Sequence, residues 1–288
     1  MYLGNVEEYI AFYELTMYNT LEVIFLENYS FRQRDTSLFI SRQRDLHPKP
    51  GFFDKHTHTR YEILFFLDGD ATEVIEGRKY KLKKYDLIFL RPGEYHFLQI
   101  DSSADYDRYV LYFDPAEIGI DPNTYISANT DIWNCRHRAI IQDLFKRFDY
   151  YRSTLDENTF LDMCKLLIKE LIYNLSIEAD LPEPDRLQNS HPIINSALEE
   201  INANLFAIKN ISDVASKLYV TESYLYRIFK QELKTTPYKY ICEKRLYIAH
   251  SLINQGQAPT HVYRECGFND YTSFYRSYVK LFGHAPSK

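Results

Sequence analysis

The alternation of apolar and polar residues divides the chain into a strand-rich part and a helical part. Between residues 36 and 115, short apolar or alternating runs are separated by turn-forming pairs such as Pro92-Gly93. The clearest runs are Tyr61–Leu67, Thr72–Ile75 and Leu87–Leu90. Short strands at this spacing are typical of antiparallel all-β architectures. We therefore predict a small antiparallel barrel or jelly roll for this part of the chain.

The apolar period becomes that of a helix after Arg136. Apolar residues then recur every three or four positions, which predicts amphipathic helices over about 136–151 and 158–176. Their apolar faces must be buried either against the barrel or in a subunit interface, and the sequence favours neither. The segment 178–192 that follows carries three prolines and few apolar residues, so it is predicted to be a linker.

Beyond the linker, a helix-turn-helix pattern occurs twice. Thr221 can cap the second helix of the first pattern, and Thr236-Pro237 can begin a long helix between the two patterns. Three positions recur at an offset of 49 residues, with Leu225, Arg227 and Phe229 matched by Phe274, Arg276 and Tyr278. Two such helices on one rigid body can enter successive major grooves, roughly 34 Å apart. The repeat favours sequence-specific DNA binding over the alternative, an ordinary helical bundle.

The distribution of charge agrees with this division. The chain has a net charge of −6 at pH 7, but residues 187–288 hold 12 Lys and Arg against 8 Asp and Glu. Residues 1–186 hold 22 basic against 32 acidic side chains. Only the C-terminal part therefore has the sign that DNA phosphates attract.

Cysteine usage and the absence of targeting signals bear on the compartment. The four cysteines have no metal-type spacing, so they are expected to be buried, reduced thiols: Cys135, Cys164, Cys242 and Cys266. The sequence MYLGNVEEYI lacks the features of a signal peptide, and no apolar run is long enough to span a bilayer. A cytoplasmic protein without a membrane partner is expected.

One face of each second helix lies opposite the buried apolar face. It carries Ser223, Tyr226, Arg227 and Lys230 in the first unit, and Thr272, Tyr275, Arg276 and the apolar Val279 in the second. Three segments carry a resemblance to a known family: ISDVASKLYVTESYLYRIFKQEL, TPYKYICEKRLYIAHSLI and CGFNDYTSFYRSYVKLFGHAPSK. They are similar to the DNA-binding domain of AraC/XylS-type bacterial transcriptional regulators.

The resemblance implies base-reading roles for six residues: Ser223, Tyr226, Arg227, Thr272, Tyr275 and Arg276. Either arginine could bridge O6 and N7 of a guanine, and Lys230 is expected to contact phosphate. Four positions depart from the family pattern: Lys234, Pro259, Tyr263 and Val279. These departures leave open a binding mode in which the first unit dominates.

The strand-rich part resembles the two cupin motifs. They read Gly51-x4-His56-x-His58-x3-Glu62-x6-Gly69 and Pro92-Gly93-x2-His96. A strand would place His56, His58 and Glu62 on one face, and His96 would come from a facing strand. Three nitrogens and one carboxylate could then ligate a divalent metal such as Zn, Fe, Mn or Ni. The favoured alternative is that these four residues line a small-molecule pocket and hold no metal.

We therefore predict an α+β protein of two domains. Residues 1–178 form a cupin-like antiparallel barrel with two flanking helices, which senses a ligand and dimerises; 179–191 form a linker; 192–288 form an all-α tandem helix-turn-helix domain. The predicted function is sequence-specific transcriptional regulation, as an activator or a repressor, in response to a small, sugar-like metabolite, without catalytic residues. The expected partners are promoter DNA, the effector, a second copy of the chain and RNA polymerase. The alternative is a metal-dependent cupin enzyme with a helical assembly domain.

Overall fold

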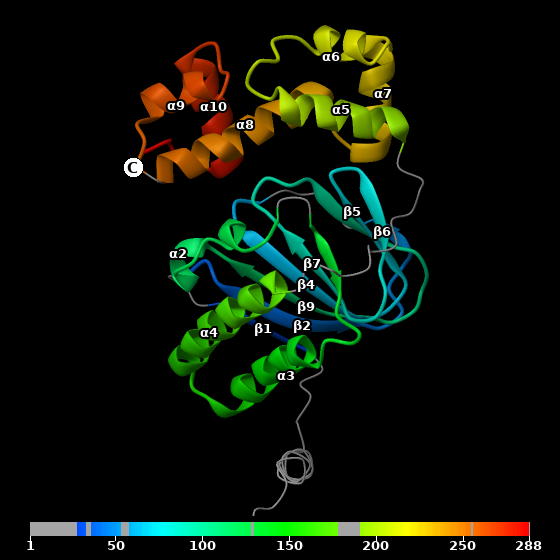
Figure 1. Ribbon diagram of the computed structural model, residues 1–288, viewed down its shortest axis with the longest axis vertical. Coiled ribbons are helices and arrows are strands. Elements are labelled where there is room, and N and C mark those ends of the chain that lie inside the picture. The colour runs from blue at the N-terminus through cyan, green and yellow to red at the C-terminus, as the bar shows by residue number, and fades with distance from the viewer. Residues whose placement is uncertain are drawn as a thin grey trace, which may run out of the picture.

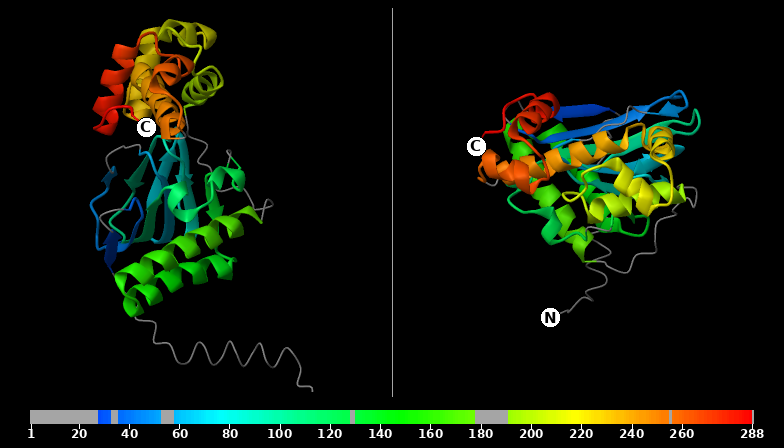
Figure 2. Two further views of the ribbon diagram at one scale, coloured as in Figure 1. Left: turned by 90° about the vertical axis from the view of Figure 1, so that its left-hand side faces the viewer. Right: turned by 90° about the horizontal axis from the view of Figure 1, so that it is seen from above.

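The structure is a computed structural model that describes residues 28–32, 36–52, 58–127, 130–177, 191–254 and 256–287. Its N-terminal part is built from two antiparallel sheets flanked by two long helices, and its C-terminal part contains helices only (Figure 1). The C-terminal helices lie together at one end of the sheets, on the opposite side of the molecule from the two flanking helices (Figure 2). Except for His191, the predicted linker lies outside the described residues.

The two sheets face each other across an apolar interior. The larger sheet runs in the order β1 (Tyr29–Arg32), β2 (Phe39–Asp45), β9 (Tyr106–Phe113), β4 (Tyr61–Asp68), β7 (Asp86–Leu90) and β10 (Ile132–Asn134). The smaller sheet runs β3 (Gly51–Phe52), β8 (His96–Ile100), β5 (Ala71–Ile75) and β6 (Arg78–Lys81). All paired strands are antiparallel. The predicted antiparallel architecture is confirmed.

Strand β4 is buried on both faces, and its alternate side chains enter two different apolar cores. Leu64 and Phe66 belong to the core between the sheets, whereas Ile63 and Phe65 belong to the core beneath the flanking helices. Glu62 has the same parity as Leu64, so its carboxylate is directed between the sheets.

The flanking helices pack on the outer face of the larger sheet. They are α3 (Ala139–Thr154) and α4 (Glu157–Ser176), and their buried side chains join those of the sheet in one apolar core. The rings of Phe65 and Phe145 stack with centroids 4.1 Å apart. The barrel therefore covers one face of each helix. Apolar side chains remain exposed at Ile140 on α3, at Leu166 on α4 and at Ile177, which directly follows α4.

Two short elements precede β10. They are a helix, α2 (Pro115–Ile118), and a 3-10 turn, η1 (Pro122–Thr124).

Six helices make up the described residues of the C-terminal part, in two clusters joined by one long helix. They are α5 (Pro192–Ala203), α6 (Ile211–Lys217), α7 (Glu222–Leu233), α8 (Pro237–Asn254), α9 (Pro259–Glu265) and α10 (Tyr271–Phe282). The first half of α8 packs with α5, α6 and α7 through Tyr240 and Ile241. Its second half packs with α9 and α10 through Leu246, Ala249 and Ile253. The long helix expected from Pro237 thus joins both units.

The cysteines and the length of the helices were also predicted from the sequence. All four cysteines are free thiols; Cys135, Cys164 and Cys266 are buried and Cys242 is half-buried. Among the described helices, none combines the length and the apolar character needed to cross a bilayer.

Candidate functional site

The first candidate DNA-reading helix is α7, and its polar face is turned to solvent. Thr221 caps this helix by accepting a hydrogen bond from the Tyr224 amide. Its apolar side is buried through Leu225, Ile228 and Phe229. On the other side Ser223, Arg227 and Lys230 are exposed, and Tyr226 is half-buried. The Arg227 guanidinium lies 4.9 Å from the centre of the Tyr224 ring, a cation–π contact that orients the side chain without burying it.

The second candidate reading helix is α10, which has the same arrangement. Asp270 caps it by accepting from the Ser273 amide, and Phe274 and Tyr278 are buried. On the opposite side Thr272, Tyr275 and Arg276 are exposed.

Three departures from the family pattern fit without breaking a helix. Pro259 is the first residue of α9, where a missing N–H interrupts no intrahelical bond. Tyr263 is buried and packs on Tyr271 and Phe274. Lys234 ends α7 with a φ of 52°, in the left-handed conformation that a glycine adopts more readily.

Arg245 on α8 joins the two helix-turn-helix units, a role that was not predicted from the sequence. Its half-buried guanidinium donates to the carbonyl oxygens of Leu205, Ile208 and Gly267, at distances of 2.6–2.9 Å. Gly267 leads into α10, and a Cβ atom there would lie only 2.6 Å from the Phe206 carbonyl oxygen. The two units therefore interlock around Arg245. A lone arginine within a helical repeat gives no sequence signal for backbone partners so distant in the chain.

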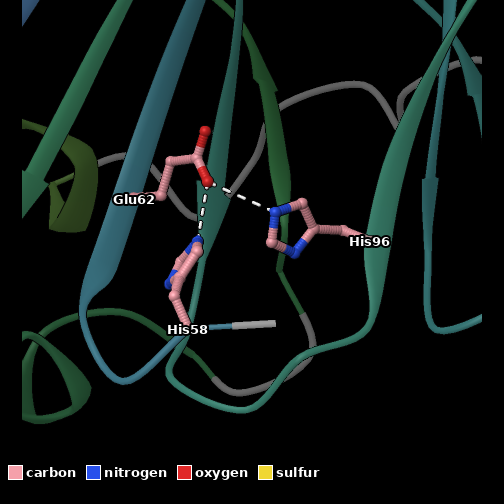
Figure 3. A group of neighbouring side chains, drawn as sticks. All are labelled: His58, Glu62 and His96. Carbon is pink, nitrogen blue, oxygen red and sulfur yellow. Dashed lines mark hydrogen bonds and ion pairs between the residues drawn. The ribbon is translucent and has the colours of Figure 1, made fainter. Parts of the chain in front are cut away.

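Inside the barrel, His58, Glu62 and His96 converge on one point (Figure 3). The Glu62 carboxylate oxygen Oε2 lies 2.8 Å from His58 Nε2 and 3.3 Å from His96 Nε2. Glu62 comes from β4 and His96 begins β8 in the facing sheet, as predicted. The expectation that His58 lies within the same strand as Glu62 is wrong, because β4 begins only at Tyr61. His56 lies outside the described residues.

Hydrogen bonding fixes both imidazole rings. Nδ1 of His58 is 2.7 Å from the Arg60 carbonyl oxygen, and Nδ1 of His96 is 3.0 Å from that of Glu94. A ring that donates from Nδ1 leaves Nε2 directed at Glu62. Burial raises the pKa of Glu62, but hydrogen bonds from both histidines outweigh it and hold that pKa at about 2. Burial lowers the pKa of His96, but the bond to Glu62 and its charge raise it to about 9.

This arrangement suits two kinds of chemistry. The candidate ligand atoms of the three side chains all lie within 4.8 Å of one another, and two Nε2 atoms with one carboxylate fit the donor set of a divalent metal. The same three groups can instead form a polar pocket wall, in which the Glu62 carboxylate pairs with both imidazoles. The metal site thus stays a prediction.

A cavity of about 300 Å³ adjoins this cluster between the sheets. Its walls are mostly apolar or aromatic: Phe39, Leu64, Leu90, Leu98, Tyr106, Val110 and Tyr112. Glu73 on β5 also lines it, is 2% exposed, and has an oxygen, Oε1, with no hydrogen-bond partner among the described residues. Burial raises the pKa of Glu73 to about 8. Glu73 was not predicted from the sequence, although a single acidic residue inside the apolar run Ala71–Ile75 was a usable signal.

Comparison with known proteins agrees with this geometry. The family described as AraC-like ligand binding domain matches residues 40–148, and the family described as helix-turn-helix domain matches residues 214–288. The lactose operon transcription activator of Staphylococcus xylosus is 22% identical over 76% of this chain and 80% of its own length. The transcriptional activator RhaS of Escherichia coli is 23% identical over 81% of this chain and 86% of its own length. The probable transcriptional regulator LumQ of Photobacterium leiognathi is 31% identical, over 27% of this chain and 32% of its own length.

Proposed function

We propose that the chain, which belongs to the AraC family of DNA-binding transcriptional regulators and is not an enzyme, activates a promoter together with RNA polymerase in the cytoplasm. The supporting observation is the pair of exposed reading faces on α7 and α10, which α8 joins. In vitro selection from random duplexes, followed by transcription with purified RNA polymerase from a template carrying the selected site, tests the proposal. We expect the full chain to enrich a common sequence and to raise transcription. A pool that stays unenriched would contradict it.

We also propose that the effector is a neutral, sugar-like molecule held in the barrel cavity. Glu73 offers an unpaired oxygen to a ligand hydroxyl, and tyrosine rings can pack on the apolar faces of a sugar. The two cationic groups among the described lining residues already have acidic or polar partners. Asp45 and Gln43 bind the guanidinium of Arg108, and Glu62 lies 3.3 Å from Nε2 of His96, which disfavours an anionic ligand. The lactose operon activator among the relatives agrees with a sugar effector.

Replacing Glu73 with leucine should abolish the response to this effector. A thermal-shift panel of lactose and neutral monosaccharides is expected to contain a compound that raises the melting temperature of the wild-type chain. Glu73→Leu should lose that shift, since the ligand hydroxyl would face an apolar group. Glu157→Leu on the exposed surface of α4 is the control and should keep it. A panel without any hit, or a shift that survives Glu73→Leu, would count against a sugar bound by Glu73.

The chain is further proposed to form a homodimer through α4. Leu166, Tyr173 and Ile177 are 58%, 38% and 75% exposed, and their spacing of seven and four residues places them along one helix face.

Leu166→Glu should convert the dimer into a monomer, because a carboxylate would be buried in an apolar interface. Light scattering coupled to size-exclusion chromatography gives the mass directly. Leu46→Glu, at a site that is 68% exposed on the barrel, introduces the same charge away from α4 and should leave the dimer intact. A monomeric wild-type chain, or a Leu166→Glu variant that stays dimeric, would contradict the proposed interface.

A further inference from the structure

The DNA-binding helices are held against the barrel by a buried contact centred on Glu76. This residue lies in the turn between β5 and β6, at the end of the sheets that faces the C-terminal helices (Figure 1). Its carboxylate accepts hydrogen bonds from the Tyr240 hydroxyl and, at 3.0 Å, from Lys244 Nζ, both on α8. The Tyr95 ring packs on the Tyr240 ring with centroids 4.9 Å apart. We call these four residues, Glu76, Tyr95, Tyr240 and Lys244, the interdomain contact.

The side chains of the interdomain contact are buried as those of a protein core are. Glu76 is 8% exposed, Tyr95 is 4% exposed and Tyr240 is fully buried. A buried carboxylate is tolerated only where charge and hydrogen bonds compensate its lost hydration, and α8 provides both. Glu76 also has a φ of 47°, a left-handed conformation that is unfavourable for a residue with a side chain. The local chain therefore adopts a costly conformation where it meets α8.

The same contact is joined to the effector cavity through the backbone. The Tyr95 amide donates to the Glu76 carboxylate at 2.9 Å, and the Glu76 amide donates to the Tyr95 carbonyl at 2.7 Å. His96, whose ring faces Glu62 in the cavity, follows Tyr95 directly and pairs with Ile75, the residue before Glu76. A displacement of His96 must therefore act on the interdomain contact from two sides.

A second point of contact restrains the other half of α8. A Cβ atom at Gly93 would lie 2.9 Å from the side chain of Tyr247, so the barrel loop and α8 touch there without a gap. Since α8 carries one helix-turn-helix unit on each half, both reading helices depend on how α8 is seated.

We propose that the interdomain contact is the element through which occupancy of the barrel cavity controls the placement of the two reading helices. A molecule that moves His96 shifts Tyr95 and Glu76, and thereby changes the hold on Tyr240 and Lys244. This inference rests on the proposed function, because it takes the cavity to be the effector site.

Hydrogen–deuterium exchange of the full chain, without DNA or effector, tests the proposal. Lys244→Met should accelerate exchange of the α8 amides about tenfold, because it leaves the buried carboxylate without its cationic partner. Tyr240→Phe removes only one hydroxyl and should act in the same direction. Lys239→Met and Tyr238→Phe are matched controls on the same helix, because the Lys239 side chain is 65% exposed and pairs with Glu243 on α8 itself, and Tyr238 is 66% exposed. Neither control should change exchange more than twofold.

A double-mutant cycle then tests the connection to the cavity. His96→Ala should change α8 exchange at least threefold in the wild-type background and have no further effect on Lys244→Met. His96→Gln serves as the second variant if the alanine chain does not fold. Unchanged α8 exchange in Lys244→Met, or equal effects of the His96 change in both backgrounds, would overturn the proposal. Because no DNA is present, such a result would leave the proposed DNA-binding function untouched.

Discussion

Arg227→Ala is expected to weaken binding to the selected DNA site by roughly 1–3 kcal/mol, which is about fivefold to more than a hundredfold in affinity. The Arg227 side chain is exposed on α7 and lies over the Tyr224 ring. It therefore loses little conformational entropy when it binds a guanine. The loss should be confined to the selected sequence, because a base contact contributes nothing on other sequences. Fluorescence anisotropy with selected and scrambled duplexes measures both affinities.

Two further variants are compared with Arg227→Ala. Lys230→Ala, one turn further along α7, should weaken binding to both duplexes alike and reduce the salt dependence by about one phosphate contact. Arg276→Ala probes the equivalent position on α10, and an effect much smaller than that of Arg227→Ala would establish that the first unit dominates. If Arg227→Ala weakened both duplexes equally, Arg227 would be a phosphate contact and the assignment of α7 as a base-reading helix would fail.

Arg245→Met is expected to lower the free energy of unfolding by about 3 kcal/mol and to abolish tight binding to the selected site. Methionine keeps much of the aliphatic stem but leaves three carbonyl groups without the guanidinium that now binds them. The two units would then no longer be fixed to α8 in one arrangement, so binding by one unit would not position the other. Urea denaturation and anisotropy measure the two effects separately.

Arg264→Met is the matched control for this change. Arg264 is exposed on α9, and its side chain donates to the neighbouring Tyr263 hydroxyl. Removing that side chain should cost less than about 0.5 kcal/mol. If Arg245→Met were as mild as Arg264→Met, the interlock of the two units would have to depend on apolar packing alone.

Periodic features of the structure were predictable from the sequence, because periodicity reflects which face of an element is buried. The exposed face of α7 and the buried Phe274 and Tyr278 of α10 follow directly from helical spacing. The start of α3 was predicted three residues too early, because a turn after β10 precedes it and the Gln142 side chain binds the carbonyl groups of that turn.

Features that depend on contacts distant in sequence were missed. Arg245 and Glu76 act through partners that only the folded chain brings near, and no local pattern marks either residue. His58 was assigned to a strand because an HxH pattern has the period of a strand. Its ring instead reaches Glu62 from the turn before β4, where the Arg60 carbonyl orients it. The contact was predictable from spacing and the backbone conformation was not.

The close approach at Gly267 has a consequence for the promoter. Because no room remains at this point for even a methyl group between the two units, the two reading helices keep a fixed distance and orientation relative to each other. Each base pair inserted between the half-sites turns one of them by roughly 34° around the duplex axis. The protein cannot follow that rotation, so the duplex itself must twist or bend. Binding sites with easily deformed base-pair steps are therefore favoured, even at positions that no side chain contacts.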